Sequence, residues 1–327
     1  MLNAKELLEI INQAIAKISY QRTPDSLYKP IRYVLSLGGK RIRPVLMMLA
    51  YNLYRDDVQT ILPQALAIEI YHNYTLLHDD LMDKAELRRG KPTVHKIWNN
   101  NAAILSGDTM LVMAYKSMIH QCPAQKMQDV LNLFSETALQ IGEGQQYDMD
   151  FETRNDVTEA EYIEMIRLKT SVLLACSMKI GAILADAPHN DASLLYDFGQ
   201  NLGLAFQLQD DYLDVYGDPA VFGKNTGGDI LCNKKTFLLI HAYNRADHDL
   251  RTQLNDWMTK PYNTFNPTEK IEAVTTIYNR LNIREICNKK IDDYFNKASE
   301  LLNQLPLPES RKACLRDMAH SLLLRKA

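Results

Sequence analysis

Apolar residues recur three and four positions apart from one end of this chain to the other, and clear period-two segments are missing. This spacing puts apolar side chains on one face of an α-helix, whereas a strand would alternate at every second residue. Glycine and proline are sparse, at 13 and 12 of 327 residues, while helix-favouring residues such as Leu, Ala, Met and Lys are plentiful. The sequence therefore predicts an all-α protein of roughly ten or more helices.

Residues 159–184 show this spacing over one long segment. One helical face there would carry Tyr162, Ile163, Ile166, Thr170, Leu173 and Leu174. The pattern breaks at residues 22–25, 37–44, 87–93, 120–125, 150–156, 186–191, 215–230 and 260–267, most of which are rich in Gly, Pro, Asn or Asp. No low-complexity linker and no shift in composition divides the chain, so we expect residues 1–327 to form a single domain.

Composition argues against several classes of partner. Hydrophobic residues make up 46% and charged residues 24%, and the net charge of −3 favours neither nucleic acid nor an anionic membrane. The five cysteines are scattered without a CxxC pair, and the N-terminal MLNAKELLEIINQ has no signal-peptide core. No window reaches the ~18 apolar residues of a membrane span. We expect a cytoplasmic protein with reduced thiols, no nucleic-acid partner and no membrane span.

Two acidic segments occur at positions where the helical spacing predicts buried apolar residues. They are LLHDDLMD at 76–83 and FQLQDDYLD at 206–214. Asp79 and Asp83 are four residues apart and share a helix face, with Thr75 and Tyr71 behind them on the same line. The second segment repeats this line with Phe198, Leu202, Phe206, Asp210 and Asp214, and each segment carries one further aspartate, Asp80 or Asp211. The apolar stripe of each helix thus turns into carboxylates at its C-terminal end.

A solvated helix end is the plain interpretation of one such segment taken alone. However, carboxylates near a helix C-terminus oppose its dipole, and like charges four residues apart repel, so local stability does not select them. Oxygen-only clusters suit Mg²⁺, which takes one or two carboxylates together with substrate phosphates. Two such clusters could face each other across a cavity and hold several Mg²⁺ ions.

Basic residues accompany the acidic segments. Each one alone is compatible with a solvated surface charge, although Lys169 lies among apolar residues in mid-helix. Together they suggest an anionic ligand held between Mg²⁺ and Lys or Arg. His72, two turns before the first acidic segment, is either structural or a ligand contact. The basic residues are Lys40, Arg41, Arg43, Arg88, Arg89, Lys169, Lys224, Lys234 and Lys235.

The ordered set of motifs resembles the trans-isoprenyl diphosphate synthases, the polyprenyl synthetase family. The resemblance covers about residues 20–325 and rests on GGKRIRP, HDDLMD followed by LRRGKPT, GQQYD, KT, FQLQDDYLD, FGK and GGDILCNKKT. It implies an isoprenoid-synthase-type helical bundle around a central cavity, usually a homodimer. It also implies a Mg²⁺-dependent head-to-tail condensation of isopentenyl diphosphate with an allylic diphosphate, with three Mg²⁺ ions per active site.

The resemblance also implies roles for individual residues. Asp79, Asp83 and Asp210 would be the main Mg²⁺ ligands, with Asp80, Asp211 and Asp214 assisting through water or phosphate. The allylic diphosphate would be bound by Arg88, Lys169, Lys224 and Lys234, and isopentenyl diphosphate by Gly39, Lys40, Arg43, His72 and Arg89. Lys169, Thr170 and Gln207 would be catalytic, the last two beside the developing allylic cation. Asp148 would support the site, and the C-terminal Arg325 and Lys326 would close over it.

The helix before the first acidic segment bears on product length. At 1.5 Å per residue, Tyr74 lies roughly 7 Å and Tyr71 roughly 12 Å below Asp79, and these rings beside Thr75 would form a floor for the growing chain. By the family's pattern, an aromatic five residues before an uninterrupted motif resembles geranylgeranyl (C20) synthases and favours C20 over the farnesyl (C15) alternative. The competing interpretation is that Tyr71 and Tyr74 are ordinary core aromatics.

Three other functions compete with this prediction. A terpene cyclase would also use an acidic Mg²⁺ cluster but should lack the basic set Lys40, Arg43, His72 and Arg89. A non-catalytic regulatory subunit would be expected to lose aspartates or Lys169, and none of these is lost. A purely structural helical module would have no use for two matched acidic segments.

Overall fold

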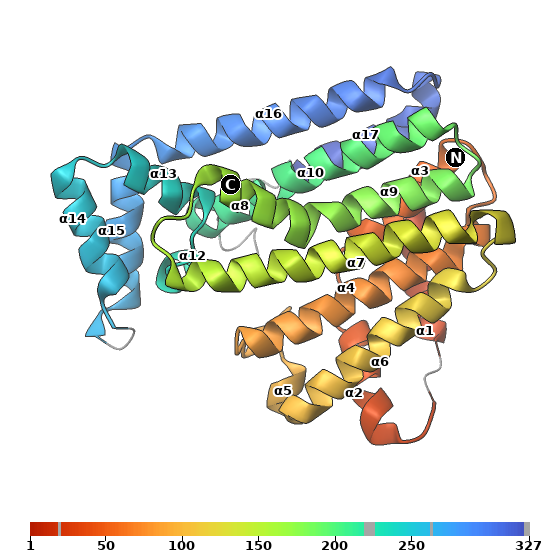
Figure 1. The fold of residues 1–327 in the computed structure, drawn as a ribbon, viewed down its shortest axis with the longest axis horizontal. Helices are drawn as coiled ribbons and strands as arrows, with labels where there is room; N and C mark the ends of the chain where they lie inside the picture. Colours follow the sequence, from red (N-terminus) through yellow and green to blue (C-terminus); the bar gives the residue numbers. More distant parts are fainter. Residues whose placement is uncertain (19–20, 219–225, 262–263, 324–327) are drawn as a thin grey trace. The chain divides into compact units, whose positions relative to one another are not determined.

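The computed structural model describes residues 1–18, 21–218, 226–261 and 264–323, and within them the only strands are a pair of two-residue segments (Figure 1). The prediction of an all-α fold is confirmed. Contacts within the chain divide it into two compact units, each described here by itself. The first unit comprises Met1–Ser135, Cys176–Leu195 and Leu307–Leu315; the second comprises Glu136–Ala175, Tyr196–Pro306 and Arg316–Ala327.

Helices and strands follow one another along the chain with short connections. Up to residue 119 they are α1 (Ala4–Lys17), α2 (Asp25–Ser36), α3 (Ile42–Asn52), the 3₁₀ turn η1 (Val58–Ile61), α4 (Leu62–Met82), β1 (Leu87–Arg88), β2 (Lys91–Pro92), α5 (Val94–Ile97) and α6 (Asn100–Ile119). Next come α7 (Ala124–Thr153), α8 (Glu159–Ile166), the π-helical η2 (Arg167–Ser171), α9 (Val172–Leu184) and α10 (His189–Tyr216). The last are α12 (Gly228–Leu231), α13 (Phe237–Arg245), α14 (His248–Thr259), α15 (Pro267–Arg280), α16 (Ile283–Gln304) and α17 (Glu309–Leu323).

Several helices begin at side chains that can cap them. The Asn3 side chain accepts hydrogen bonds from the backbone of Lys5 and Glu6, and the Glu6 carboxylate accepts one from the Asn3 backbone N–H. Thr158 and Glu161 form the same reciprocal box at the start of α8. These pairs satisfy N–H groups that have no partner inside the helix, so the sequence itself marks where the helices start.

The core of the first unit forms around α4. This helix packs along α6 and against α3, whose residues 44–52 are all buried (Figure 1). The Gln64 amide donates to the backbone oxygens of Met118, at 3.1 Å, and His120, at 2.8 Å, which ties the start of α4 to the end of α6. These contacts hold α4 in place, and the first acidic segment lies at the C-terminal end of this helix.

The second unit has its own apolar core, built mainly from α8, α10, α13, α15 and α16. Tyr162, Leu208, Phe237 and Tyr278 are among its buried members. In this core the second acidic segment of α10 lies beside the start of α8 and the π-helical segment η2. No described helix is long and apolar enough to cross a membrane.

Two details differ from the sequence prediction. Residues 159–184 do not keep a single helical face, because η2 inserts a π-helical turn between α8 and α9 and shifts the register of the side chains that follow. The sequence pattern also predicts no break between α3 and α4, but the helix ends at Asn52 and the next α-helix begins at Leu62. The Asn52 side-chain amide donates to the Arg55 backbone oxygen at 2.8 Å, so a local turn replaces the helix there.

Candidate active site

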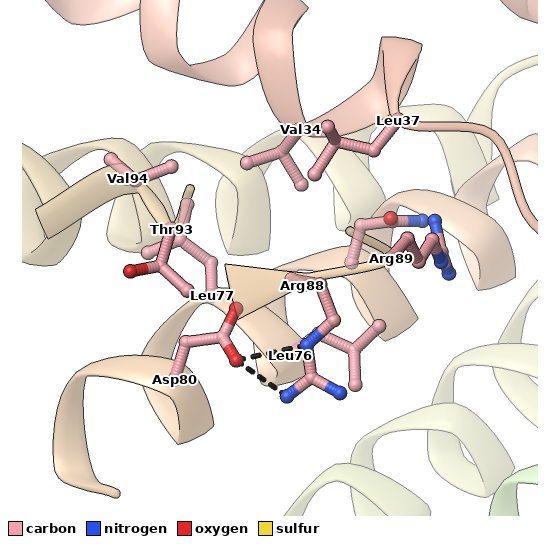
Figure 2. A pocket seen from close by; sticks show the side chains of 10 residues that line it. Val34, Leu37, Leu76, Leu77, Asp80, Arg88, Arg89, Thr93 and Val94 are labelled. Atoms are coloured by element: carbon pink, nitrogen blue, oxygen red, sulfur yellow. Dashed lines mark hydrogen bonds and ion pairs between the residues drawn. The ribbon is translucent and has the colours of Figure 1, made fainter. Parts of the chain in front are cut away.

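The first acidic segment ends α4. Asp80 is buried, and its Oδ1 accepts hydrogen bonds from Arg88 Nε at 2.8 Å and Nη2 at 2.5 Å. Arg88 Nη2 lies 3.5 Å from Asp79 Oδ2, and Asp83 caps the helix end and is exposed. Burial raises the pKa of the Asp80 carboxyl, although Arg88 opposes this. Arg88 is thus an ion-pair partner of this segment, directed mainly at Asp80 (Figure 2).

Arg88 reaches the acidic segment because the chain turns back directly after α4. Strands β1 and β2 pair Leu87 with Pro92 and Arg88 with Lys91, and Arg89 and Gly90 form the turn at φ 54° and 72°. The same segment borders a small pocket with largely apolar walls (Figure 2). Its lining comprises Val34, Leu37, Asn73, Leu76, Leu77, Asp80, Arg88, Arg89, Thr93 and Val94.

The predicted isopentenyl diphosphate set lies together in part. Arg43 Nη1 donates to His72 Nε2 at 3.0 Å, which requires a neutral His72 with its proton on Nδ1. Burial, followed by the charges of Arg43 and Arg89, holds the pKa of His72 well below its ordinary value. Burial lowers the pKa of Arg43 to about 10, with Glu69 opposing and Arg89 adding to the shift. The Arg43 guanidinium thus contacts α4 at His72, two helical turns before Asp79.

Arg89 closes over the glycine loop. Its Nη1 donates to the backbone oxygen of Gly38, and a Cβ on Gly39 would lie 2.8 Å from Arg89 Cζ. Because Gly39 also has φ 132°, only glycine fits this position without strain. Lys40 follows, exposed, in the same loop.

Arg41 differs from its basic neighbours. Arg41 and Glu69 form a buried ion pair at 2.6 Å, and the Arg41 guanidinium also donates to the Leu35 backbone oxygen at 2.8 Å. Asn73 Nδ2 donates to the same Glu69 oxygen at 2.8 Å. Arg41 therefore links the start of α3 to α4, and its buried guanidinium has a structural role rather than a ligand-binding one.

The predicted floor residues belong to an aromatic cluster. Tyr71 is 2% exposed, and its ring lies 5.4 Å from that of Tyr74 and 5.2 Å from that of Phe134. Tyr115 also contacts Phe134, at 4.9 Å between ring centroids. The smaller side chain of Thr75 donates its hydroxyl to the His72 backbone oxygen at 2.8 Å. Sequence reasoning missed Phe134 and Tyr115, because α6 and α7 come far later in the chain.

The second acidic segment lies on α10. Gly228 and Asp229, at the start of α12, both donate backbone N–H groups to the Asp214 carboxylate, the latter to Oδ2 at 2.9 Å. Burial and the nearby Asp229 raise the pKa of Asp214 to about 6. Asp214 therefore fixes the turn that leads to Lys234, while Asp210 is half-buried.

The π-helical segment η2 presents Lys169 and Thr170 together. Lys169 Nζ donates to Asp148 Oδ2 of α7 at 2.6 Å. Burial raises the pKa of Asp148, but Lys234 and Lys169 lower it by more, so it lies below its ordinary value. The two helices can approach this closely because of Gly144, where a Cβ would lie 2.8 Å from Lys169 Cα. Gly144 and Asp148 are the ends of the GQQYD motif and lie one turn apart on α7.

A chain of hydrogen bonds runs from η2 into the second acidic segment. Thr170 Oγ1 donates to Gln207 Oε1 at 3.0 Å, and Gln207 Nε2 donates to Asp211 Oδ1 at 3.0 Å. The other Asp211 oxygen, Oδ2, accepts from the Tyr162 hydroxyl. Burial and the charge of Asp229 raise the pKa of Asp211 to about 7, against the opposing charge of Lys234. Tyr162 appeared in the sequence only as an apolar-face residue.

Three predicted site residues, Lys224, Arg325 and Lys326, lie outside the described residues. The other predicted site residues are divided between the two units, and their assigned roles stay predictions.

The carboxylates suit a hard divalent cation. Among the described residues no group of three or more His, Cys, Asp and Glu side chains is arranged to hold a metal. Mg²⁺ commonly needs only one or two carboxylates, because water and phosphate oxygens complete its shell. Asp79, with 18% of its side chain exposed, and the exposed Asp83 share one helix face and supply such oxygens. This donor set is chemically compatible with Mg²⁺.

Comparison with known proteins identifies a family model and relatives that match most of this chain. A family model described as polyprenyl synthetase matches residues 24–278. Geranylgeranyl diphosphate synthase of Methanosarcina mazei is 41% identical over 238 residues, which is 72% of this chain and 73% of the relative. Geranylfarnesyl diphosphate synthase of Natronomonas pharaonis is 34% identical over 338 aligned positions, 98% of this chain and 96% of the relative.

Solved structures of similar fold include two geranylgeranyl pyrophosphate synthases. A crystal structure of geranylgeranyl pyrophosphate synthase matches with a TM-score of 0.95 at 41% identity, covering 100% of both chains. The geranylgeranyl pyrophosphate synthase of Corynebacterium glutamicum, complexed with isoprenyl diphosphate and magnesium, matches at 0.88 and 25% identity over 99% of this chain and 100% of that one. The fold and these matches define an isoprenoid-synthase type of enzyme, a prenyltransferase. This chain belongs to the polyprenyl synthetase family.

Proposed function

We propose that this protein is a short-chain trans-prenyltransferase that condenses isopentenyl diphosphate head to tail with allylic diphosphates. One observation carries the proposal: each acidic segment is accompanied by the cations that a diphosphate needs. Arg88 accompanies Asp79 and Asp80, and Lys169 and Lys234 accompany the second segment. In this proposal the chain acts as a single domain, and both acidic segments serve the same pair of substrates.

The reaction begins when the allylic C–O bond breaks and negative charge grows on the departing diphosphate. Arg88, Lys169 and Lys234, with Lys224, stabilise that charge, which is largest in the transition state. Asp79, Asp83 and Asp210 would hold Mg²⁺, three ions per site, and bound Mg²⁺ would supply Lewis-acid stabilisation of the leaving diphosphate. Lys169 forms an ion pair with Asp148 at 2.6 Å, and in this proposal it exchanges that carboxylate for the diphosphate.

The second substrate must be held with its double bond toward the cation. Gly39, Lys40, Arg43 and Arg89 bind the diphosphate of isopentenyl diphosphate, and His72 orients Arg43 by accepting its hydrogen bond. The Thr170 oxygen faces the developing cation, and water is excluded so that the alkene is the only nucleophile. After the new C–C bond forms, a proton leaves to the released diphosphate.

The product we propose is geranylgeranyl diphosphate. The aromatic cluster of Tyr71, Tyr74, Phe134 and Tyr115 supports a closed floor beneath Asp79. The identity to a geranylgeranyl diphosphate synthase supports the same product. Farnesyl diphosphate is the alternative product if Tyr74 alone limits the length of the isoprenoid chain. Geranylfarnesyl diphosphate, the product named for one relative, would require the aromatic side chains to move apart.

A homodimer in the cytoplasm completes the proposal. One face of α6 carries four exposed apolar side chains, Ile104, Leu105, Val112 and Ile119, with Val112 67% exposed. Such a face is suited to cover its equivalent on a second copy. All five cysteines are free thiols, which supports a reducing compartment.

Product analysis tests the assignment. The protein would be incubated with Mg²⁺, labelled isopentenyl diphosphate and each of dimethylallyl, geranyl and farnesyl diphosphate, and the dephosphorylated alcohols separated by length. We expect a C20 alcohol, no turnover after EDTA, and no turnover by Asp79→Ala or Asp210→Ala variants that remain folded. A cyclic hydrocarbon without isopentenyl incorporation would identify a terpene cyclase. No condensation with any starter would overturn the proposal and favour a regulatory subunit.

A further inference from the structure

The second aspartate of the second acidic segment is placed differently from a metal ligand. Asp211 is 3% exposed, and both of its oxygens accept hydrogen bonds from protein, from Gln207 and from Tyr162. Because the carboxylate is almost completely buried and each of its oxygens is bound by a protein donor, it has almost no contact with solvent. Its chemical effect must therefore pass through the groups it binds.

The direction of the hydrogen bonds determines what those groups can do. A carboxylate only accepts, so Gln207 must turn its NH₂ group toward Asp211 and its carbonyl oxygen away. That carbonyl can only accept, so the Thr170 hydroxyl must donate to it. The hydroxyl hydrogen of Thr170 therefore points toward Gln207 Oε1, and the lone pairs of Thr170 Oγ1 point away from Gln207. If the Asp211 carboxyl carried a proton on Oδ2, the Tyr162 oxygen could accept it, and the same order would persist.

We infer that Tyr162 and Asp211 are positioning residues that orient the Gln207 amide and, through it, the Thr170 hydroxyl, so that an oxygen rather than a hydrogen faces the allylic cation. This inference rests on the proposed function, in which such a cation forms beside Thr170. Without the Tyr162–Asp211 pair, the amide could flip and Thr170 could turn a positive hydrogen toward the developing positive charge. Tyr162 is 1% exposed and its hydroxyl is bound to Asp211, so in this inference it acts through that carboxylate.

The variant Tyr162→Phe removes the hydroxyl and keeps the buried ring. We expect kcat to fall about 10- to 100-fold, because a small misorientation of a catalytic group has effects of this size. The KM values for both substrates should change by less than about twofold, since the interaction is made in the transition state. The Mg²⁺ dependence of the rise in melting temperature on adding inorganic diphosphate should also stay unchanged, because this readout reports metal and anion binding without turnover.

Tyr54→Phe is the matched control. Tyr54 also donates its hydroxyl to a buried aspartate, Asp191 Oδ2, at 2.9 Å, but that pair joins the turn after α3 to the start of α10. Its loss should lower the melting temperature and leave kcat as in the parent protein. If both variants lose stability and neither loses kcat, the positioning role is wrong. If Tyr162→Phe weakens the Mg²⁺-dependent stabilisation in parallel with kcat, Asp211 acts through the metal and the inference is overturned.

A second pair of variants covers the case in which Tyr162→Phe does not fold. In Asp211→Asn the amide oxygen can still accept from Gln207 while its NH₂ donates to Tyr162, so this variant should keep more of kcat than Asp211→Ala. Equal losses, accompanied by weaker Mg²⁺-dependent stabilisation, would contradict the inference. Failure of the parent protein to condense the substrates would instead refute the proposed function, which the parent assay reports separately.

Discussion

Arg43 and His72 form a polar pair whose protonation follows from burial. Because an arginine always donates, the 3.0 Å contact makes His72 Nε2 an acceptor, and the lowered pKa keeps the ring neutral. In the unfolded chain the same imidazole would titrate at an ordinary value near about 6.5. The pair therefore links folding stability to pH.

His72 should make the free energy of unfolding depend on pH in a defined direction. When the pH falls below about 6.5, the unfolded chain takes up a proton that the folded chain does not, so the contribution of His72 to stability is full above this pH and is lost below it. The slope approaches about 1.4 kcal/mol per pH unit for one such group. In His72→Gln, whose amide oxygen can still accept from Arg43, this part of the slope should disappear. Urea unfolding at several pH values between neutral and 5 measures it, and equal slopes for both proteins would disprove the assignment.

Tyr74 is the residue on which product length should depend first. It is half-buried and lies one turn closer to Asp79 than the fully buried Tyr71. Tyr74→Ala should lengthen the product by one or more isoprene units, because removing the ring opens space along α4. Tyr28→Ala removes a half-buried ring from α2 and should leave the product unchanged. Chain-length analysis decides; an unchanged product from Tyr74→Ala would make Tyr74 a core aromatic only.

At the scale of elements, the close approach of α7 to η2 places Asp148 against Lys169. This approach depends on Gly144, since any Cβ there would meet the backbone of residues 168 and 169. Gly142 lies two residues earlier on the same helix, and a Cβ added there would have no atom within 4 Å. The two glycines therefore offer a comparison in which helix propensity is the same and only packing differs.

Gly144→Ala should destabilise the protein by about 1–3 kcal/mol, the usual cost of overpacking, and should lower kcat by displacing Lys169 and Thr170. Gly142→Ala should be neutral or stabilise by about 0.5–1 kcal/mol, because alanine favours the helix. Urea midpoints and steady-state kinetics of both variants provide the test. Equal behaviour of the two would show that η2 does not depend on this contact.

At the scale of the whole molecule, the exposed face of α6 is the feature that a monomer does not explain. Ile104, Leu105, Val112 and Ile119 lie within about 100° of one another around the helix axis. Val112→Lys should convert the proposed dimer into monomer, because a desolvated charge at the centre of an isologous contact is repeated on both copies. Thr252→Lys, on the exposed side of α14, adds the same charge and should not. Light scattering measures the mass; a monomeric parent protein would exclude the proposed dimer.

The sequence by itself determined the helical class, most of the breaks and the two acidic segments. These features depend on spacing along one helix, such as the four-residue step from Asp79 to Asp83, and on residues such as Gly, Pro and Asn that act through their own backbone. Its motifs also determined the family, because the resemblance rests on their order along the chain. The caps at Asn3 and Thr158 are local in the same sense.

Only the tertiary structure decided which polar groups meet. It separated Arg41, buried with Glu69, from Arg43, bound to His72, although the two arginines are two residues apart. It also turned residues 167–171 into a π-helical segment and joined Tyr162 to Asp211 across 49 residues. A local pattern states which face a side chain takes, but its partner comes from another helix, and the cost of burying an unpaired polar group selects that partner only once the helices have packed.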